Sequence, residues 1–130
     1  MLVDDDARFR TTARRALVAE GVDVVAEVAD GDLVGAVVER WHPDVVLVDI
    51  RMPGVDGLEV ARQLHVAAAD VQGAGPRPGV PAPTVILMST VDETYGRQLA
   101  ADLAAGYLPK HELSLAAIRN LSEPPRRPAD

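Results

Sequence analysis

The stretch from Asp44 to Gly57 constrains the fold more than any other part of this 130-residue chain. Residues 45–48 form an unbroken apolar run, which is typical of a strand covered on both faces in a parallel sheet. Met52-Pro53-Gly54 cannot continue that strand, because proline lacks a backbone N–H and restricts the residue before it. Asp49 therefore stands at the carboxyl end of a buried strand, where open α/β sheets bind their ligands. Taken alone, Asp49 could equally be an acid at the start of a loop that caps a neighbouring element.

Composition and charge exclude several classes of protein. A length of 130 residues with a hydrophobic share of 48% is enough for one domain with its own core. The formal net charge of −7 argues against direct nucleic-acid binding, which requires a basic surface. The absence of cysteine excludes disulfides, thiol catalysis and zinc–thiolate sites. No apolar run is long enough to span a membrane and no signal-peptide pattern is present, so we expect a cytoplasmic protein without a membrane partner.

Apolar runs and helical patterns alternate along the chain. We expect strands at residues 1–3, 22–28, 45–48, 84–88 and 106–109. We expect helices from an acidic cap at Asp5 or Asp6 to Gly21, at residues 33–41, after Gly57, at residues 93–105, and from a Ser114 cap to Leu121. Such an alternation predicts a parallel sheet with helices on both faces.

Three segments have a different character. Residues 70–83 are rich in glycine and proline, so we expect an exposed loop at the edge of the sheet opposite Asp49. Residues 122–130 are rich in proline and are expected to form a tail behind a domain at residues 1–121. The arginines of the first helix are expected to form a solvated face.

One edge of the predicted sheet collects the polar residues that follow its strands. These residues are Asp4, Asp5, Asp49, Ser89 and Lys110. Three carboxylates in one crevice repel each other and need a cation, and a site of oxygen ligands suits Mg²⁺. A lysine and a hydroxyl beside them complete a phosphoryl-binding set, and an aspartate can accept a phosphoryl group. The alternatives are helix caps for the acids and a backbone-bonding hydroxyl for Ser89.

The order of these residues resembles the receiver domain of response regulators in two-component signalling. The matching motifs are Val3-Asp4-Asp5-Asp6, Asp49 to Gly57, Met88-Ser89-Thr90 and Gly106 to Lys110. The resemblance extends from Leu2 to about Leu121. It implies a flavodoxin-like α/β fold, in which a doubly wound five-stranded parallel sheet of order 2-1-3-4-5 is flanked by five helices.

The resemblance also implies a role for each residue of the constellation. Asp49 would be the phosphoacceptor. Asp5, Asp49 and the backbone carbonyl of Arg51 would bind Mg²⁺ directly, and Asp4 would act through water. Lys110 would contact a phosphoryl oxygen.

Ser89 and Tyr107 are implied to form the conformational switch. Ser89 would move to hydrogen-bond the phosphoryl group, and Tyr107 would turn inward and so reshape the face of the fourth helix, fifth strand and fifth helix. An ordinary edge-strand aromatic is the alternative for Tyr107. The sequence departs from many family members at His111, where they have a proline.

The implied partners are a sensor histidine kinase or a phosphotransfer protein, together with a downstream protein target. The resemblance also allows a homodimer through the same face of the fourth helix, fifth strand and fifth helix. We do not expect an enzyme, because a phosphatase with a strand-end aspartate needs a second aspartate two residues later, where this chain has Arg51. The alternative function is a phosphorylation-independent receiver that acts only as an interaction module. Such receivers usually lack one of the acids or the lysine, and all are retained here.

Overall fold

The computed structural model describes residues 1–74, 83–90, 93–102 and 106–122. Within this part of the chain, five parallel strands pair in the order β2-β1-β3-β4-β5, as the resemblance to receiver domains implies. The strands are β1 (Leu2–Val3), β2 (Glu27–Val28), β3 (Val45–Asp49), β4 (Thr84–Ser89) and β5 (Gly106–Pro109). The helices are α1 (Ala7–Ala19), α2 (Val34–Trp41), α3 (Gly57–Ala74), α4 (Glu93–Asp102) and α5 (Leu115–Ser122).

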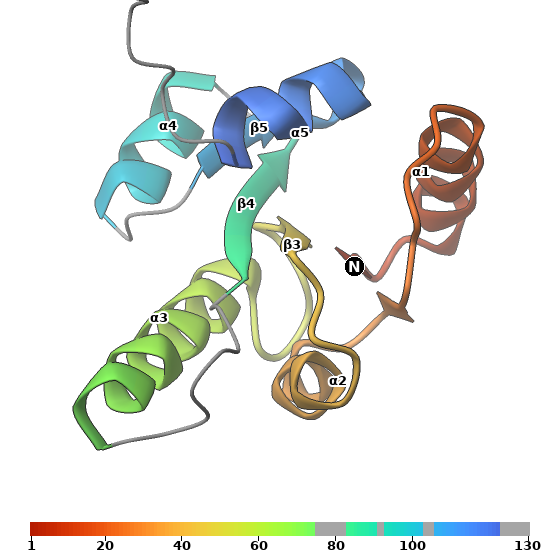
Figure 1. Ribbon diagram of the computed structural model, residues 1–130. Helices are drawn as coiled ribbons and strands as arrows, with labels where there is room; N and C mark the ends of the chain where they lie inside the picture. The colour runs from red at the N-terminus through yellow and green to blue at the C-terminus, as the bar shows by residue number, and fades with distance from the viewer. Residues whose placement is uncertain (75–82, 91–92, 103–105, 123–130) are drawn as a thin grey trace, which may run out of the picture.

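Helices cover both faces of the sheet (Figure 1). Alternate side chains of β3 point to opposite faces and so divide the core in two. Leu47 packs with Leu17 of α1 and Ile118 of α5, whereas Val48 packs with residues of α2, α3 and α4, among them Val60. The central strand is buried from both sides, which explains its unbroken apolar run.

Side-chain caps fix the helices that follow the strands. The Asp6 carboxylate accepts hydrogen bonds from the backbone N–H groups of Arg8 and Phe9 at the start of α1. The Ser114 hydroxyl oxygen accepts one from the N–H of Ala117 in α5, at 3.1 Å. Each cap satisfies backbone donors that have no partner inside the helix. The predicted caps at Asp6 and Ser114 are thus confirmed.

The predicted second strand is too long. Only Glu27–Val28 is a strand, because its neighbour β1 is only two residues long and offers no partner for residues 22–25. The N–H of Val22 instead donates to the carbonyl oxygen of Leu17 at 2.9 Å, which closes the end of α1.

The predicted loop at residues 70–83 begins too early. Helix α3 continues through residues 70–74, because the first proline, which would end a helix, comes only at Pro76. Ser122 likewise belongs to α5 and not to the tail. Residues 75–82, 103–105 and 123–130 lie outside the described residues, and with them the rest of the predicted loop, the end of the predicted fourth helix and the proline-rich tail.

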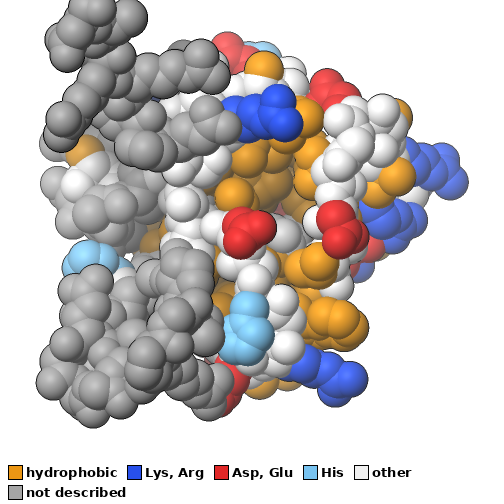
Figure 2. All heavy atoms as spheres, viewed as in Figure 1, with side chains coloured by type: hydrophobic (Ala, Val, Ile, Leu, Met, Phe, Trp, Pro, Cys, Tyr) orange, Lys and Arg blue, Asp and Glu red, His pale blue; other side chains and the backbone are white. Residues whose placement is uncertain are grey.

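Apolar surface lies at the end of the sheet opposite Asp49. A hollow of about 330 Å³ there is lined by apolar groups that include Met1, Leu17, Val24 and Val45. Figure 2 shows hydrophobic side chains gathered near the middle of one face of the molecule, with acidic side chains beside them. Among the described helices, none combines the length and the apolar character that a membrane span requires.

Candidate functional site

Three carboxylates meet at the carboxyl end of the sheet. Asp4 and Asp5 follow β1, Asp49 ends β3, and one oxygen of each lies within 4.8 Å of the others. Asp4 is fully buried and Asp49 is 7% exposed, whereas Asp5 faces solvent. The structure thus brings together the acidic residues that the sequence singles out, and leaves one of them accessible from outside.

Lys110 is the cation of this cluster and the only lysine of the chain. Its Nζ atom lies 2.7 Å from Asp4 Oδ2 and 3.4 Å from Asp49 Oδ2. It is also 4.4 Å from the centre of the Phe9 ring, a distance typical of a cation–π contact. A single lysine therefore faces two buried carboxylates from the short helical turn after β5.

The pKa values reflect an excess of negative charge. Burial and the charge of Asp4 raise the pKa of Asp49, and the opposing effects of Lys110 and the Arg51 N–H do not cancel them. Burial lowers the pKa of Lys110, but its hydrogen bond to Asp4 and the charges of Asp49 and Asp4 outweigh burial and raise that pKa. A cluster of carboxylate oxygens that its lysine does not fully neutralise fits a hard divalent cation such as Mg²⁺.

The loop after β3 holds Asp49 through backbone contacts. The N–H of Arg51 donates to Asp49 Oδ1 at 3.2 Å, and the N–H of Gly57 donates to the carbonyl oxygen of Ile50 at 3.1 Å. A Cβ atom at Gly57 would lie 2.1 Å from the carbonyl oxygen of Asp49, so only glycine lets α3 begin this close to the strand. The close approach of α3 to β3 therefore explains why the Asp49 motif ends in glycine.

Ser89 and Tyr107 lie on the two strands beyond Asp49. Asp49 pairs in register with Met88, which puts the buried Ser89 one residue further along the end of β4. Tyr107 of β5 is only 5% exposed and belongs to the core on the side of α4. Strand β5 lies at the edge of the sheet, yet its aromatic ring is buried.

Two residues beside the site are missed by the sequence analysis. Arg10 donates from Nη1 to the carbonyl oxygen of Asp4 at 2.5 Å and pairs with Glu27 of β2 at 3.7 Å. The prediction of a solvated arginine face is therefore wrong for Arg10. Its spacing to Ala13 and Leu17 could have shown this, because residues three and seven apart share one face of a helix and both of these are buried.

The chain matches the response regulator receiver domain family over residues 1–120. The transcriptional regulatory protein DegU of Brevibacillus brevis is 34% identical over 111 residues, which cover 85% of this chain and 42% of DegU. The response regulator MprA of Mycobacterium leprae (strain TN) is 35% identical over 126 residues, which cover 93% of this chain and 49% of MprA. The chain thus spans about half the length of these curated relatives.

Solved structures give the same result. The BeF3-activated N-terminal receiver domain of RstA from Klebsiella pneumoniae has a TM-score of 0.72 and 27% identity, and covers 95% of this chain and 97% of that one. The response regulator ChrA of a heme-sensing two-component system has a TM-score of 0.60 and 30% identity, with coverage of 93% and 52%. With the fold and the acidic site already described, these matches show that the chain belongs to the response regulator receiver domain family.

Proposed function

We propose that this receiver domain accepts a phosphoryl group on Asp49 from a partner histidine kinase or phosphotransfer protein, in a reaction that depends on Mg²⁺. The observation that carries the proposal is the convergence of Asp4, Asp5 and Asp49 on Lys110 at one end of the sheet. Membership of the family supports it, since receiver domains of response regulators interact with histidine kinases or phosphotransfer proteins.

The reaction moves one phosphoryl group between two side chains. A carboxylate oxygen of Asp49 forms a bond to phosphorus, while the bond from phosphorus to the donor's imidazole nitrogen breaks. The electron pair of that bond leaves with the imidazole, which takes up a proton. Phosphoryl transfer needs mainly positioning and charge compensation, and Lys110 offers a positive charge 3.4 Å from Asp49 Oδ2.

Asp5, Asp49 and the backbone carbonyl of Arg51 are the proposed ligands of Mg²⁺, and Asp4 acts through water. The exposed position of Asp5 gives a cation access to the cluster from solvent. When bound, Mg²⁺ neutralises carboxylates and phosphoryl oxygens together, which is its usual arrangement in proteins. On the buried side of the site, the ion pair between Asp4 and Lys110 holds both side chains in position.

Intact-mass measurement after incubation with acetyl phosphate tests this function. We expect a gain of one phosphoryl group that requires Mg²⁺ and is lost in Asp49→Asn. Asp32→Asn is the matched control, because Asp32 is an exposed acid outside the cluster, and it should label as the wild type does. Persistent labelling of Asp49→Asn would place the acceptor elsewhere. A wild type that neither acetyl phosphate nor a phosphorylated kinase labels would favour the interaction-module alternative.

Ser89 and Tyr107 are the proposed switch, with Ser89 also contacting the phosphoryl group. They would couple phosphorylation to the face built by α4, β5 and α5, where a downstream protein or a second copy of the chain would bind. The Tyr107 ring is already buried in this structure, and its close approach to Gly96 of α4 is the contact through which the ring would act on this face. A Cβ atom at Gly96 would lie 2.2 Å from Cε2 and 2.4 Å from Cζ of that ring.

Gly96→Ala is expected to drive the Tyr107 ring out of its buried position. The added methyl group occupies the space of the ring, and such overpacking costs about 1–3 kcal/mol, partly offset by the better helix propensity of alanine. Fluorine NMR of protein labelled with 3-fluorotyrosine measures the exposure of the ring, with Tyr107→Phe to assign the signal. The Tyr107 signal should move toward the exposed value and no longer respond to phosphorylation.

Gly35→Ala in α2 is the control for helix propensity. A Cβ atom at Gly35 meets nothing within 4 Å, so this variant should gain up to about 1 kcal/mol and leave the Tyr107 signal unchanged. A Gly96→Ala protein whose Tyr107 signal stays buried and still responds to phosphorylation would contradict the link between α4 and the ring.

A further inference from the structure

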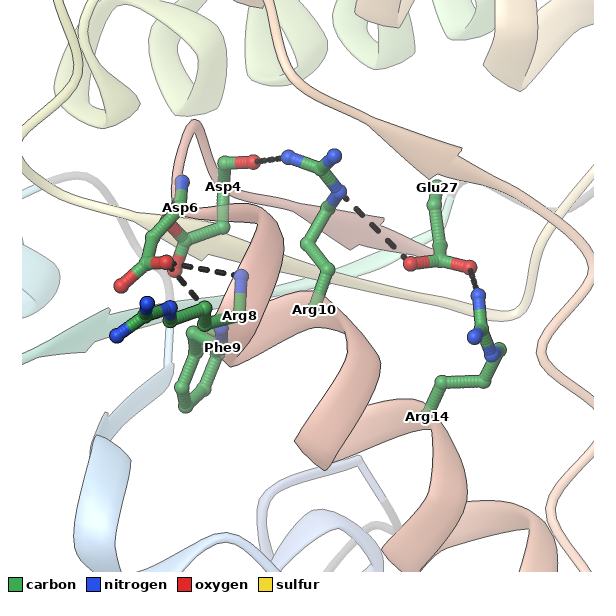
Figure 3. A network of polar contacts seen from close by, with 7 residues as sticks. All are labelled: Asp4, Asp6, Arg8, Phe9, Arg10, Arg14 and Glu27. Carbon is green, nitrogen blue, oxygen red and sulfur yellow. Dashed lines mark hydrogen bonds and ion pairs between the residues drawn. The ribbon is translucent and has the colours of Figure 1, made fainter.

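A line of polar contacts joins the acidic cluster to β2 (Figure 3). The guanidinium of Arg10 lies between Asp4 and Glu27, and Arg14 contacts the other oxygen of the Glu27 carboxylate. Arg10 Nη1 donates to the Asp4 carbonyl oxygen at 2.5 Å, and its Nε lies 3.7 Å from Glu27 Oε1. The side chains of Arg10 and Glu27 are only 19% and 23% exposed, so water screens this pair less than a surface pair.

The oxygen that Arg10 contacts belongs to the peptide unit between Asp4 and Asp5. The other groups of Asp4 are also engaged, because its N–H donates to the Val28 carbonyl oxygen at 3.0 Å and its Oδ1 accepts from the Asp6 N–H at 2.9 Å. Since a peptide unit is planar, a fixed carbonyl also fixes the direction in which the chain enters Asp5. The Arg10 contact thus sets the backbone from which the exposed carboxylate of the cluster projects.

Arginine suits this task better than any other side chain. Its planar guanidinium carries several donors in a rigid fork, so it can bond a carbonyl oxygen and a carboxylate at once. Glu27 holds the fork from β2, where it pairs in register with Leu2 of β1. The backbone turn after β1 is therefore tied to the neighbouring strand through one side chain of α1.

We propose that Arg10, held by Glu27, is a positioning residue for the metal site, and that the affinity of the domain for Mg²⁺ depends on it. Arg10 touches neither the phosphoryl group nor the cation in this proposal. It acts through the peptide unit that leads into Asp5. The inference rests on the proposed function, because it takes the acidic cluster to be the Mg²⁺ site.

The test is the dissociation constant for Mg²⁺, measured by isothermal titration calorimetry without any phosphodonor. Arg10→Ala should raise this constant about tenfold or more, as is typical when a residue that orients a metal ligand is removed. Arg10→Lys should give an intermediate value, because a lysine can reach the carbonyl oxygen or Glu27 but lacks the fork. Arg15→Ala removes an equal charge from an exposed position of the same helix and should leave the constant unchanged.

Charge and position predict opposite results for Arg10. If the arginine acted only as a positive charge, its removal would strengthen the binding of a cation, whereas lost positioning weakens it. Arg10→Met combined with Glu27→Gln removes the contacts with no change in net charge, and should also weaken Mg²⁺ binding. Melting curves in EDTA establish that each variant folds, and if Arg10→Ala does not fold, Arg10→Lys decides.

Unchanged or tighter Mg²⁺ binding in the Arg10 variants would overturn the inference. A wild type that binds Mg²⁺ but is not labelled by acetyl phosphate or its kinase would refute the proposed function and leave the role of Arg10 standing. A wild type that is labelled, with no effect of Arg10 on Mg²⁺ affinity, would refute the inference alone. A wild type that binds no Mg²⁺ would refute both.

Discussion

Replacing Lys110 with methionine is expected to lower the free energy of unfolding of the metal-free domain by about 3–5 kcal/mol, the usual cost of removing one partner of a buried ion pair. Asp4 is fully buried, and Lys110 Nζ lies 2.7 Å from its Oδ2. Methionine keeps most of the volume and can still pack on the ring of Phe9, so the loss is mainly that of the charge. Urea denaturation in EDTA at neutral pH measures the difference.

Two further results separate charge from packing in this variant. Mg²⁺ should reduce the difference in free energy of unfolding between Lys110→Met and the wild type, because it supplies a cation to the same carboxylates. Arg15→Met removes an equal charge from an exposed position and should change stability by no more than about 0.5 kcal/mol. A loss below about 1 kcal/mol for Lys110→Met, far under the roughly 3–5 kcal/mol expected for a broken buried ion pair, would show that another group compensates the charge of Asp4.

The pH dependence gives the same residue a second signature. Because the pKa of Lys110 is raised above its ordinary 10.5, the folded domain holds that proton more tightly than the unfolded chain does. This stabilisation is fully present below pH 10.5 and is lost as the pH rises through the raised value. Lys110→Met should lack this alkaline loss.

The strands and the polar residues at their ends could be predicted because their signals are local, and the strand order followed from the resemblance to receiver domains. The apolar run of β3 must be buried on both faces, and the acid at its end then falls at the carboxyl edge of the sheet. Lys110 joins the cluster because β5 pairs beside β4 and ends at the same edge. Neither conclusion needs more than strand order and the ends of the strands.

The remaining features depend on neighbours that the sequence does not reveal. Residues 22–25 read as a strand, but a strand needs a partner, and β1 is too short to provide one. The spacing of Arg10 to Ala13 and Leu17 could separate it from the other arginines of α1, but not show that it meets Glu27 and the Asp4 carbonyl. The burial of Tyr107 on an edge strand likewise depends on Gly96 in a different element.

Asp49→Asn is expected to be more stable than the wild type in EDTA and less stable in Mg²⁺. Burial and the charge of Asp4 raise the pKa of Asp49 above 3.8, so the folded domain binds this proton more tightly than the unfolded chain. The stability of the wild type therefore falls as the pH rises from the ordinary aspartate value through the raised one, and remains lower above it. Asparagine has nearly the same shape without the charge, so the metal-free variant escapes this loss.

Mg²⁺ should make the wild type more stable than Asp49→Asn, because Asp49 is a proposed ligand of the cation. A cation at 100 times its dissociation constant adds about 2.7 kcal/mol to the stability of a protein that binds it only when folded. The wild type should gain this amount, and the variant much less. Melting temperatures at pH 7, measured in EDTA and in Mg²⁺, show whether the more stable protein in one condition is the less stable one in the other. Asp32→Asn is expected to have the melting temperature of the wild type in both conditions. If Mg²⁺ raises the stability of Asp49→Asn as much as that of the wild type, Asp49 is not a ligand. A variant less stable in EDTA would mean that the contacts of Asp49 with Lys110 and the Arg51 N–H outweigh its repulsion by Asp4.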